Sequence, residues 1–394
     1  MMTLDELREI RAKLDAGKIP PPPKTSYVNN HIHTTYSFSP YTPTEAVYIA
    51  WKNGLGTAGI MDHDSTAGAR EFLEAADILD MPVTCGVECR VDMSDTVLCG
   101  RRINNPDQVS VAYVAMHGIP HCNLEKVNDF FAPYRAARNV RNRAMCERIN
   151  KLMEPYGISV DFDTDVLPSS NYAKGGTVTE RHLMFALAKK IVERYQLPEQ
   201  VVAFLGDEMG MKLSDKNRRK LLDAHPDFYV YDLLGVLKSD LIGKVYIPAT
   251  DELPDAMTFV KMVHDNGGIA AYAYLGDVGD SVTGDKKSQR FEDEYLDAVV
   301  CVLQGLGFDA VTYMPTRNSP EQLARVMNIC RLHNFFQISG EDINSPRQSF
   351  VCSALDDPHF RHLIINTYTL IGYEKIASEN ISAARERFSE IFNK

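Results

Sequence analysis

SYVNNHIHTTYSFSP, residues 26–40, places two histidines directly after a short apolar run. Tyr27 and Val28 lead into His31 and His33, and residues 42–45, Thr-Pro-Thr-Glu, are typical of a helix start. Side chains alternate along a strand, so these two imidazoles share one face at the strand's outgoing end. Paired imidazole nitrogens suit a borderline divalent metal. The alternative is an ordinary pair, one histidine buried and hydrogen-bonded and the other exposed.

The same pattern, an apolar run that closes in polar residues before a helical segment, recurs along the chain. The runs are rich in Val, Ile and Ala without strict alternation, which is typical of strands buried on both faces. Seven such units predict a parallel βα barrel or a doubly wound sheet. The runs are Tyr27–Asn29, Thr57–Met61, Pro82–Val87, Val109–Met116, Gly268–Tyr274, Ala310–Met314 and Phe335–Ile338.

A helical region interrupts this alternation between residues 122 and 246. We expect it to form a second, smaller domain, a cap beside the strand ends, flanked by barrel residues 25–121 and 247–394. Residues 1–24 read as an N-terminal helix and a Pro-rich lead-in. The helices expected in the cap are Arg135–Leu152, Val178–Tyr195, Glu199–Leu205, Lys216–Ala224 and Tyr231–Leu237.

Four of the seven apolar runs end in a cluster of polar residues. Parallel βα folds gather their sites at the carboxyl ends of strands, so these clusters are expected to face one another. Their His, Asp and Glu side chains are the nitrogen and oxygen ligands of a metal site, and a shared carboxylate such as Glu88 would bridge two ions. The clusters are Ile60–Asp64, Gly86–Glu88, Met116–Gly118 and Ser339–Asp342.

With these motifs the chain resembles the PHP (polymerase and histidinol phosphatase) family of metal-dependent phosphoesterases over residues 25–390. The resemblance implies a distorted seven-stranded (β/α)7 barrel. Within the cap, residues 179–186 resemble a segment of the family's branch that acts on small nucleotides. The matching motifs are His31-x-His33, Asp62-His63, Gly86-x-Glu88, His117 and Gly340-Glu341-Asp342.

Three departures from the family pattern limit the metal sites that the resemblance implies. Ser39, Tyr274 and Asn344 stand near or at positions where members of the family place further ligands. The first metal keeps a complete set of His31, His33, Glu88 and Asp342.

A second metal keeps Glu88 and His117, and a third keeps little more than His63. One or two divalent ions, Zn, Mn or Fe, are therefore expected. His121 would supply a replacement ligand for the second ion, although a surface or supporting role suits it better.

The catalytic candidates are Asp62 and His63, with Asp62 holding His63 or the attacking water. Asp64 is better explained as a helix cap. A phosphate substrate needs a cationic clamp, for which Arg181, His182 and Arg317 are the candidates. Arginines at residues 135, 138, 141 and 143 follow helical spacing and predict a solvated or salt-bridged helix face.

Composition narrows the class of partner. The 394 residues carry a formal net charge of −11, which disfavours a nucleic acid polymer held through its phosphates. Eight cysteines without a CxxC pair favour free thiols in a reducing compartment. The N-terminal segment has no apolar signal core, and no apolar run approaches the length of a membrane span. A cytoplasmic location is expected, and no prediction of oligomeric state follows.

The function expected is therefore hydrolysis of a small-molecule phosphomonoester, a nucleotide or a sugar phosphate, by a metal-activated hydroxide. The expected partner is a small phosphorylated substrate. Two alternatives remain open. One is another metal-dependent hydrolase on the same barrel that acts on a carbonyl centre. The other is a non-catalytic protein that binds a metal and a phosphorylated ligand.

Overall fold

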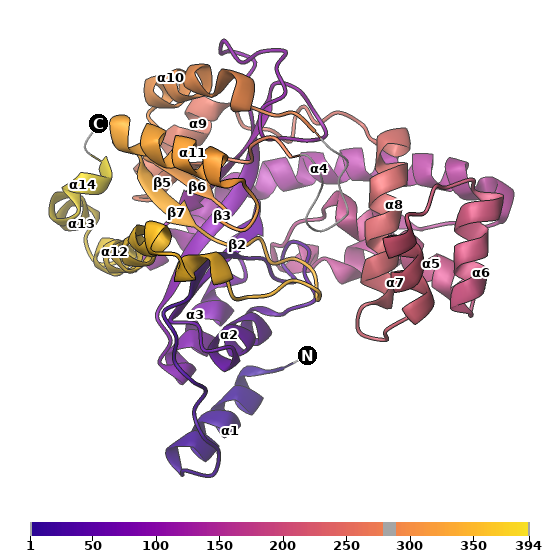
Figure 1. The fold of residues 1–394 in the computed structure, drawn as a ribbon, viewed down its shortest axis with the longest axis horizontal. Helices are drawn as coiled ribbons and strands as arrows, with labels where there is room; N and C mark the ends of the chain where they lie inside the picture. The colour runs from indigo at the N-terminus through magenta and orange to yellow at the C-terminus, as the bar shows by residue number, and fades with distance from the viewer. Residues whose placement is uncertain (1, 279–288, 393–394) are drawn as a thin grey trace.

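A seven-stranded barrel with a helical cap beside it forms the protein in a computed structural model, which describes residues 2–278 and 289–392 (Figure 1). The strands follow one another around the sheet in chain order. All seven lie at predicted positions, with ends shifted by a few residues. They are β1 (Val28–Ile32), β2 (Thr57–His63), β3 (Val83–Asp92), β4 (Val111–His117), β5 (Ile269–Ala273), β6 (Ala310–Tyr313) and β7 (Phe336–Ser339).

One strand departs from the expected all-parallel arrangement. β4 is antiparallel to both β3 and β5, whereas the other neighbouring pairs are parallel. A parallel connection needs a crossover of a dozen or more residues, usually a helix. Residues 93–110 form turns and bends instead, so the chain returns beside β3 as a hairpin. The carboxyl end of β4 therefore lies at the opposite end of the barrel from those of its neighbours.

The sheet closes on itself just beyond β7. Ile343 forms a parallel bridge with Ile32 at the end of β1. The backbone N–H of His33 donates to the Ile343 carbonyl at 2.9 Å, and the Ile343 N–H donates to the His31 carbonyl at 3.1 Å. These two bonds bring the end of β7 against the histidine pair.

Helices cover the outside of the barrel and pack on its core. α2 begins as the sequence predicts. Thr42 is its N-cap and forms a capping box with Glu45, and Pro43 occupies the first helical position. Helix α12 lies against β7, β3 and β1. The barrel helices are α1 (Leu4–Asp15), α2 (Pro43–Lys52), α3 (Ala69–Leu79), α9 (Ala256–Asp265), α10 (Leu296–Leu306), α11 (Pro320–Leu332), α12 (Arg361–Ala377), α13 (Ile381–Arg387) and α14 (Ser389–Phe392).

The cap has a hydrophobic core of its own. Figure 1 shows α4 running from the barrel into the cap, where α5 to α8 gather at one side of the molecule. The first part of α4 packs on the barrel core and its second part on the cap core. Phe38, from the loop after β1, is buried in the cap core. The cap helices are α4 (Leu124–Met153), α5 (Glu180–Arg194), α6 (Pro198–Ala203), α7 (Asp215–Asp223) and α8 (Tyr229–Val245).

The helices within residues 2–278 and 289–392 include none that combines the length and the apolar character needed to cross a membrane.

Candidate metal centre

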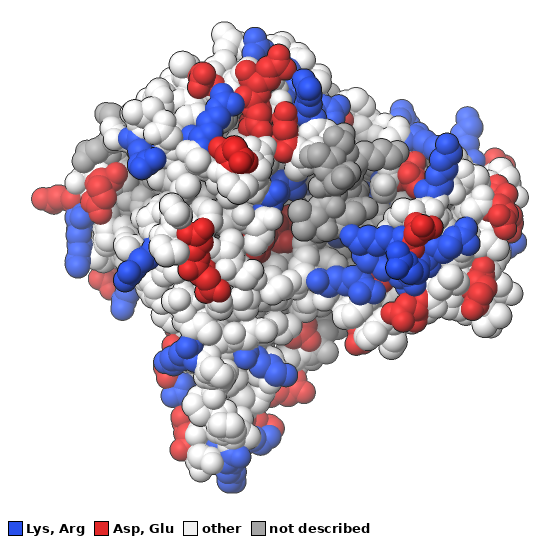
Figure 2. Space-filling model, in the orientation of Figure 1, with Lys and Arg blue, Asp and Glu red and all other residues white. Residues whose placement is uncertain are grey.

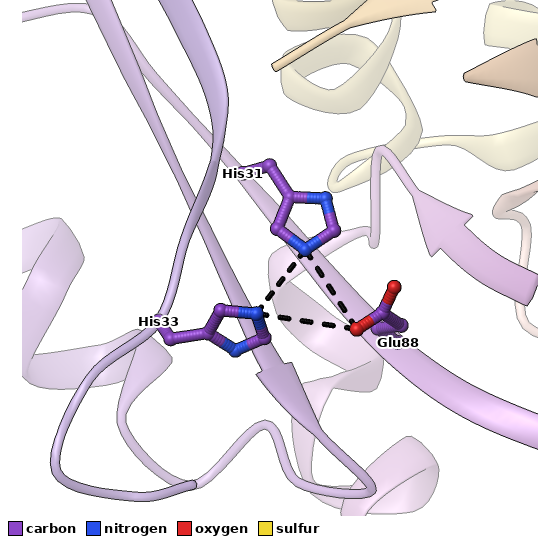
Figure 3. Close-up of side chains that lie close together, drawn as sticks. All are labelled: His31, His33 and Glu88. Atoms are coloured by element: carbon purple, nitrogen blue, oxygen red, sulfur yellow. Dashed lines mark hydrogen bonds and ion pairs between the residues drawn. The ribbon is translucent and has the colours of Figure 1, made fainter. Parts of the chain in front are cut away.

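His31 and His33 turn their imidazoles toward the same point at the carboxyl end of β1, where Glu88 of β3 meets them (Figure 3). The two Nε2 atoms lie 3.2 Å apart. Glu88 Oε2 lies 3.7 Å from Nε2 of His31 and 3.9 Å from Nε2 of His33. All three side chains are buried, and their ligand atoms form a compact group.

Two further predicted ligands border this group. Asp342 Oδ1 lies 3.1 Å from Nε2 of His33, and His63 Nδ1 lies 3.1 Å from Glu88 Oε2. Gly340 allows the chain after β7 to come this close, because a Cβ at this position would lie only 2.7 Å from both Cβ and N of His31. The structure thus brings together five of the six predicted metal ligands.

These separations fit a metal ion. For metal–ligand bonds of about 2.1 Å, two ligand atoms on one tetrahedral ion lie about 3.4 Å apart. The distances among His31, His33 and Glu88 run from 3.2 to 3.9 Å, and Asp342 joins them through His33, from which it lies 3.1 Å away. A set of two imidazole nitrogens and two carboxylate oxygens suits Zn, Mn or Fe.

The charges of the cluster also favour a cation. Burial opposes ionisation of Glu88, but the His31 and His63 imidazoles outweigh it and lower the pKa of this carboxyl to about 2. Burial and the neighbouring His33 and Arg138 lower the pKa of His63 to about 3. At neutral pH Glu88 is therefore a carboxylate and His63 a neutral imidazole. Burial opposes protonation of His31, but Glu88 and Asp342 outweigh it and raise the pKa of this imidazole, so a cation bound here would compete with a proton for His31.

Asp62 holds the loop after β1 and does not contact the cluster. Its carboxylate accepts hydrogen bonds from the Thr34 backbone N–H (2.7 Å), the Thr34 hydroxyl (2.6 Å) and the Ser37 hydroxyl (2.6 Å). Ser37 Oγ in turn lies 3.2 Å from Nδ1 of His33. Among the described residues, Asp62 bonds this loop and makes no hydrogen bond with His63, while a role in holding the attacking water stays a prediction. Nothing in the sequence indicated that Ser37 bonds His33 and Asp62, because Asp62 lies 25 residues further along the chain.

His117 lies inside the barrel outside the compact group of His31, His33 and Glu88, but near enough to His31 and Glu88 that both act electrostatically on it, and burial with His31 lowers its pKa to about 3. Glu88 pairs with Ala115 across the sheet, and His117 follows two residues later on the same face, toward the barrel floor, the end at which the parallel strands begin. Its side chain is 1% exposed, and neither ring nitrogen has a hydrogen-bond partner among the described residues. Burying an unsatisfied polar group costs about 1–3 kcal/mol, so this imidazole suits a bound ion or water.

The three altered family positions do not supply ligands in this structure. Ser39 Oγ accepts from the Tyr41 N–H at 3.3 Å, and the Tyr274 hydroxyl donates to Asp293 at 2.6 Å. Asn344 Nδ2 donates to Asp342 Oδ1 at 2.7 Å. Asn344 therefore orients a predicted ligand from the position where the family places a histidine.

Two of the predicted phosphate-binding residues lie where α5 begins. The Arg181 guanidinium lies 5.3 Å from the centre of the Phe38 ring, above the loop that carries the histidines. His182 is buried, and its Nδ1 accepts the Thr179 N–H at 3.0 Å, so this nitrogen caps the helix. Burial, together with Arg138, lowers the pKa of His182 to about 3, which makes it a neutral side chain.

The third predicted cation, Arg317, lies beyond β6 at the carboxyl ends of the strands. Its Nε donates to the Leu275 carbonyl at 3.3 Å, which ties it to the residues that follow β5. Nearby, the Thr316 hydroxyl donates to Glu341, next to the predicted ligand Asp342. Arg317 therefore stands at the rim of the barrel end that holds the cluster.

Two residues play parts that the sequence reading did not assign. Tyr113 on β4 shares the barrel-facing side of the strand with Ala115, and its ring centre lies 6.1 Å from that of His63. Only the antiparallel direction of β4 places it there. Asp64 is not the expected helix cap, since α3 has Gly68 at its N-cap. Its carboxylate accepts a hydrogen bond from Arg138 at 2.6 Å and so links the barrel to the cap.

No model of a protein family matches the sequence, and a comparison with curated proteins finds no match. Solved structures do resemble it. One is a protein of Bifidobacterium adolescentis, provisionally described as a metal-dependent phosphoesterase, with 23% identity and a TM-score of 0.56 over 90% of this chain and 100% of that one. Another is an amidohydrolase from Chromobacterium violaceum with bound sulfate and no metal, with 18% identity and a TM-score of 0.53 over 86% and 96%. At these identities the likeness shows that the chain has the same barrel fold.

Proposed function

We propose that this chain is a metal-dependent hydrolase, and specifically a phosphoesterase that acts on a small-molecule phosphomonoester of the nucleotide or sugar phosphate type. The observation that carries the proposal is the convergence of His31, His33 and Glu88 within metal-ligand separations at one end of the barrel, with Asp342 3.1 Å from His33. The description of one neighbour of the same fold as a metal-dependent phosphoesterase supports the reaction class.

The side chains divide into holding and orienting roles. The first ion would be held by His31, His33, Glu88 and Asp342. His63 lies beside Glu88, and these two side chains would hold a second ion, with the Glu88 carboxylate shared between the two ions. A bound divalent ion of this kind acts as a Lewis acid and lowers the pKa of a coordinated water. Asp62 acts through Ser37 as a positioning residue for His33.

The phosphoryl group would be held from the cap and from the rim. Arg181 and Arg317 are the cations proposed for this clamp, because a guanidinium matches phosphate oxygens with paired donors. His182 contributes by capping the helix that carries Arg181. Figure 2 shows a group of Lys and Arg side chains on the cap, with acidic side chains beside it, and charges of both signs over the barrel. The cap beside the barrel favours a small, soluble phosphate ester over a nucleic acid polymer, and we propose that the protein works in the cytoplasm.

The test combines metal analysis with turnover. Protein purified without chelator is assayed for bound metal and for phosphate release from a panel of nucleotides and sugar phosphates. We expect bound divalent metal and release by the parent chain. His33→Ala should lose metal at this cluster and fall to background, whereas His359→Ala, which alters an exposed histidine, should keep both. Metal-loaded protein that releases no phosphate with any added divalent ion would contradict the phosphoesterase proposal.

The same experiment also tests a second reaction, hydrolysis at a carbonyl centre. Tyr274 is bonded to Asp293 and does not reach the cluster, so the family's full ligand set is absent among the described residues. One neighbour of this fold is described as an amidohydrolase. Hydrolysis of an amide or ester substrate by the parent chain, lost in His33→Ala, would assign a carbonyl centre. Ligand-induced stabilisation without any turnover would instead indicate a binding protein.

A further inference from the structure

A second group of metal-ligand side chains lies at the floor of the barrel. Cys85 belongs to the first half of β3, His121 follows β4, and Glu374 is on α12. Their ligand atoms all lie within 4.8 Å of one another. Three elements far apart in the sequence therefore bring a thiol, an imidazole and a carboxyl to one place.

Glu374 is already oriented for such a role. Its Oε2 accepts the Thr84 hydroxyl at 2.5 Å, both oxygens share the Cys85 backbone N–H at 3.1 and 3.0 Å, and Oε1 also lies 2.9 Å from His121 Nε2. The carboxylate is 1% exposed. Outer contacts of this kind fix a metal-binding carboxylate, so Oε1 remains directed toward the imidazole and the thiol.

We propose that Cys85, His121 and Glu374 form a second metal centre, which takes a thiolate-binding ion such as Zn²⁺. A sulfur, a nitrogen and an oxygen are all ligands that Zn²⁺ accepts, and three protein ligands leave a fourth position for water. The His121 side chain is 35% exposed, which gives the ion a route from solvent. This centre lies at the barrel end opposite the His31–His33 cluster, so its role is to tie α12 and the segment after β4 to β3.

Binding exchanges protons for the ion. Burial, together with the nearby Glu374 carboxylate, raises the pKa of the Cys85 thiol, so the metal-free centre keeps this proton. On binding, the S–H bond breaks, sulfur bonds the ion, and the proton passes to solvent. In the metal-free centre Nε2–H of His121 donates to Glu374 Oε1; on binding this proton leaves Nε2 and the ring is protonated on Nδ1 from solvent, so the Nε2 lone pair can bond the ion with no net proton released by the imidazole. The affinity for metal should therefore rise with pH.

Cobalt tests the centre independently of the proposed hydrolase. Co²⁺ bound by a thiolate gives an intense charge-transfer band in the near ultraviolet, and none of the ligands proposed for the His31–His33 cluster is a cysteine. The full chain carrying His33→Ala is titrated with Co²⁺ and then with Zn²⁺. We expect a band that saturates at one equivalent and that Zn²⁺ abolishes.

Variants assign the ligands. Adding Cys85→Ser should abolish the band, and His121→Ala, at a partly exposed position, should weaken Co²⁺ binding at least tenfold. Cys89→Ser alters another buried thiol of β3 and should leave the band unchanged, as should Cys122→Ser next to His121. Circular dichroism checks that each variant is folded. A band that survives Cys85→Ser, or one that Cys122→Ser removes, would overturn the proposal, as would the absence of any band in folded parent protein.

Discussion

The orientation of a single imidazole depends on two side chains outside the cluster. His33 Nδ1 lies 3.2 Å from Ser37 Oγ, and the Ser37 hydroxyl donates to Asp62 at 2.6 Å. Because one ring nitrogen is engaged in this way, the other is directed at Glu88 and Asp342. A hydrogen bond to the second nitrogen of a ligating histidine fixes its tautomer and ring angle.

Ser37→Ala should therefore weaken metal binding without unfolding the protein. Loss of the bond to His33 frees the ring, and we expect the affinity for Zn²⁺ to fall by about 10–100-fold. The unfolding free energy should change by only about 1 kcal/mol, the size of one hydrogen bond. Competition with a chelating dye measures the affinity. Ser39→Ala is the matched control and should leave it unchanged, since the side-chain hydrogen bond that Ser39 makes in the described part of the chain is to the Tyr41 amide of its own loop. Equal affinities in parent and Ser37→Ala would refute the orienting role.

Helix α4 connects the two hydrophobic cores through buried ion pairs. Arg138 and Arg141, on the helix face predicted from arginine spacing, are 5% and 7% exposed. Both bind Glu180 at the start of α5, and Arg141 also binds Glu252. The expectation of salt bridges is confirmed for Arg138, Arg141 and Arg143, but only Arg143 is solvated, since Arg138 and Arg141 are buried and Arg135 donates to backbone carbonyls instead. The spacing of the arginines gave no sign of burial, because the acidic partners come from segments 39 to 111 residues away.

Glu180→Gln should destabilise the protein strongly. The substitution keeps the shape but leaves three buried guanidiniums, those of Arg90, Arg138 and Arg141, with one charge fewer. Removing one partner of a buried ion pair costs about 3–5 kcal/mol. Urea denaturation followed by circular dichroism gives the unfolding free energy. For comparison, Asp163→Asn removes the exposed pair with Arg143 and should have almost no effect. A loss below about 1 kcal/mol for Glu180→Gln would mean that the pairs do not hold the cap to the barrel.

At the scale of the whole molecule, the barrel is proposed to bind metal at both ends. The His31–His33 cluster joins β1, β3 and the end of β7, and the Cys85–His121–Glu374 centre joins β3 to α12. A ligand that binds only the folded state stabilises it by an amount set by its concentration relative to its dissociation constant. The two centres would therefore stabilise different parts of the same closed sheet.

Removal of metal by a chelator should lower the melting temperature in two separable steps. An ion present at about 100 times its dissociation constant contributes about 2.7 kcal/mol, which corresponds to a shift of a few degrees in a chain of this size. Differential scanning fluorimetry with and without EDTA measures the shift. His33→Ala should keep part of the response, and His33→Ala combined with Cys85→Ser should keep none. An equal response in the parent and in the double variant would show that metal does not stabilise this fold.

The sequence by itself determined the barrel and the centre of the candidate site. Seven apolar runs predicted seven strands, and each run became one. The convergence of His31, His33 and Glu88 followed from two local rules, the alternation of side chains along a strand and the meeting of parallel strand ends at one edge. The first rule acts within a few residues and the second follows from the repeated strand–helix units, so both can be read from the sequence.

Only the tertiary structure decided the direction of β4 and the partners that depend on it. An antiparallel β4 carries His117 toward the floor, brings Tyr113 to His63, and delivers His121 to Glu374, which lies 253 residues further along the chain. Asp62 likewise turned to the loop after β1 and not to its neighbour His63. Strand direction depends on whether the intervening segment forms a crossover helix, and buried polar groups bond whichever donors the closed barrel brings near. Both depend on contacts between residues that are distant in the sequence.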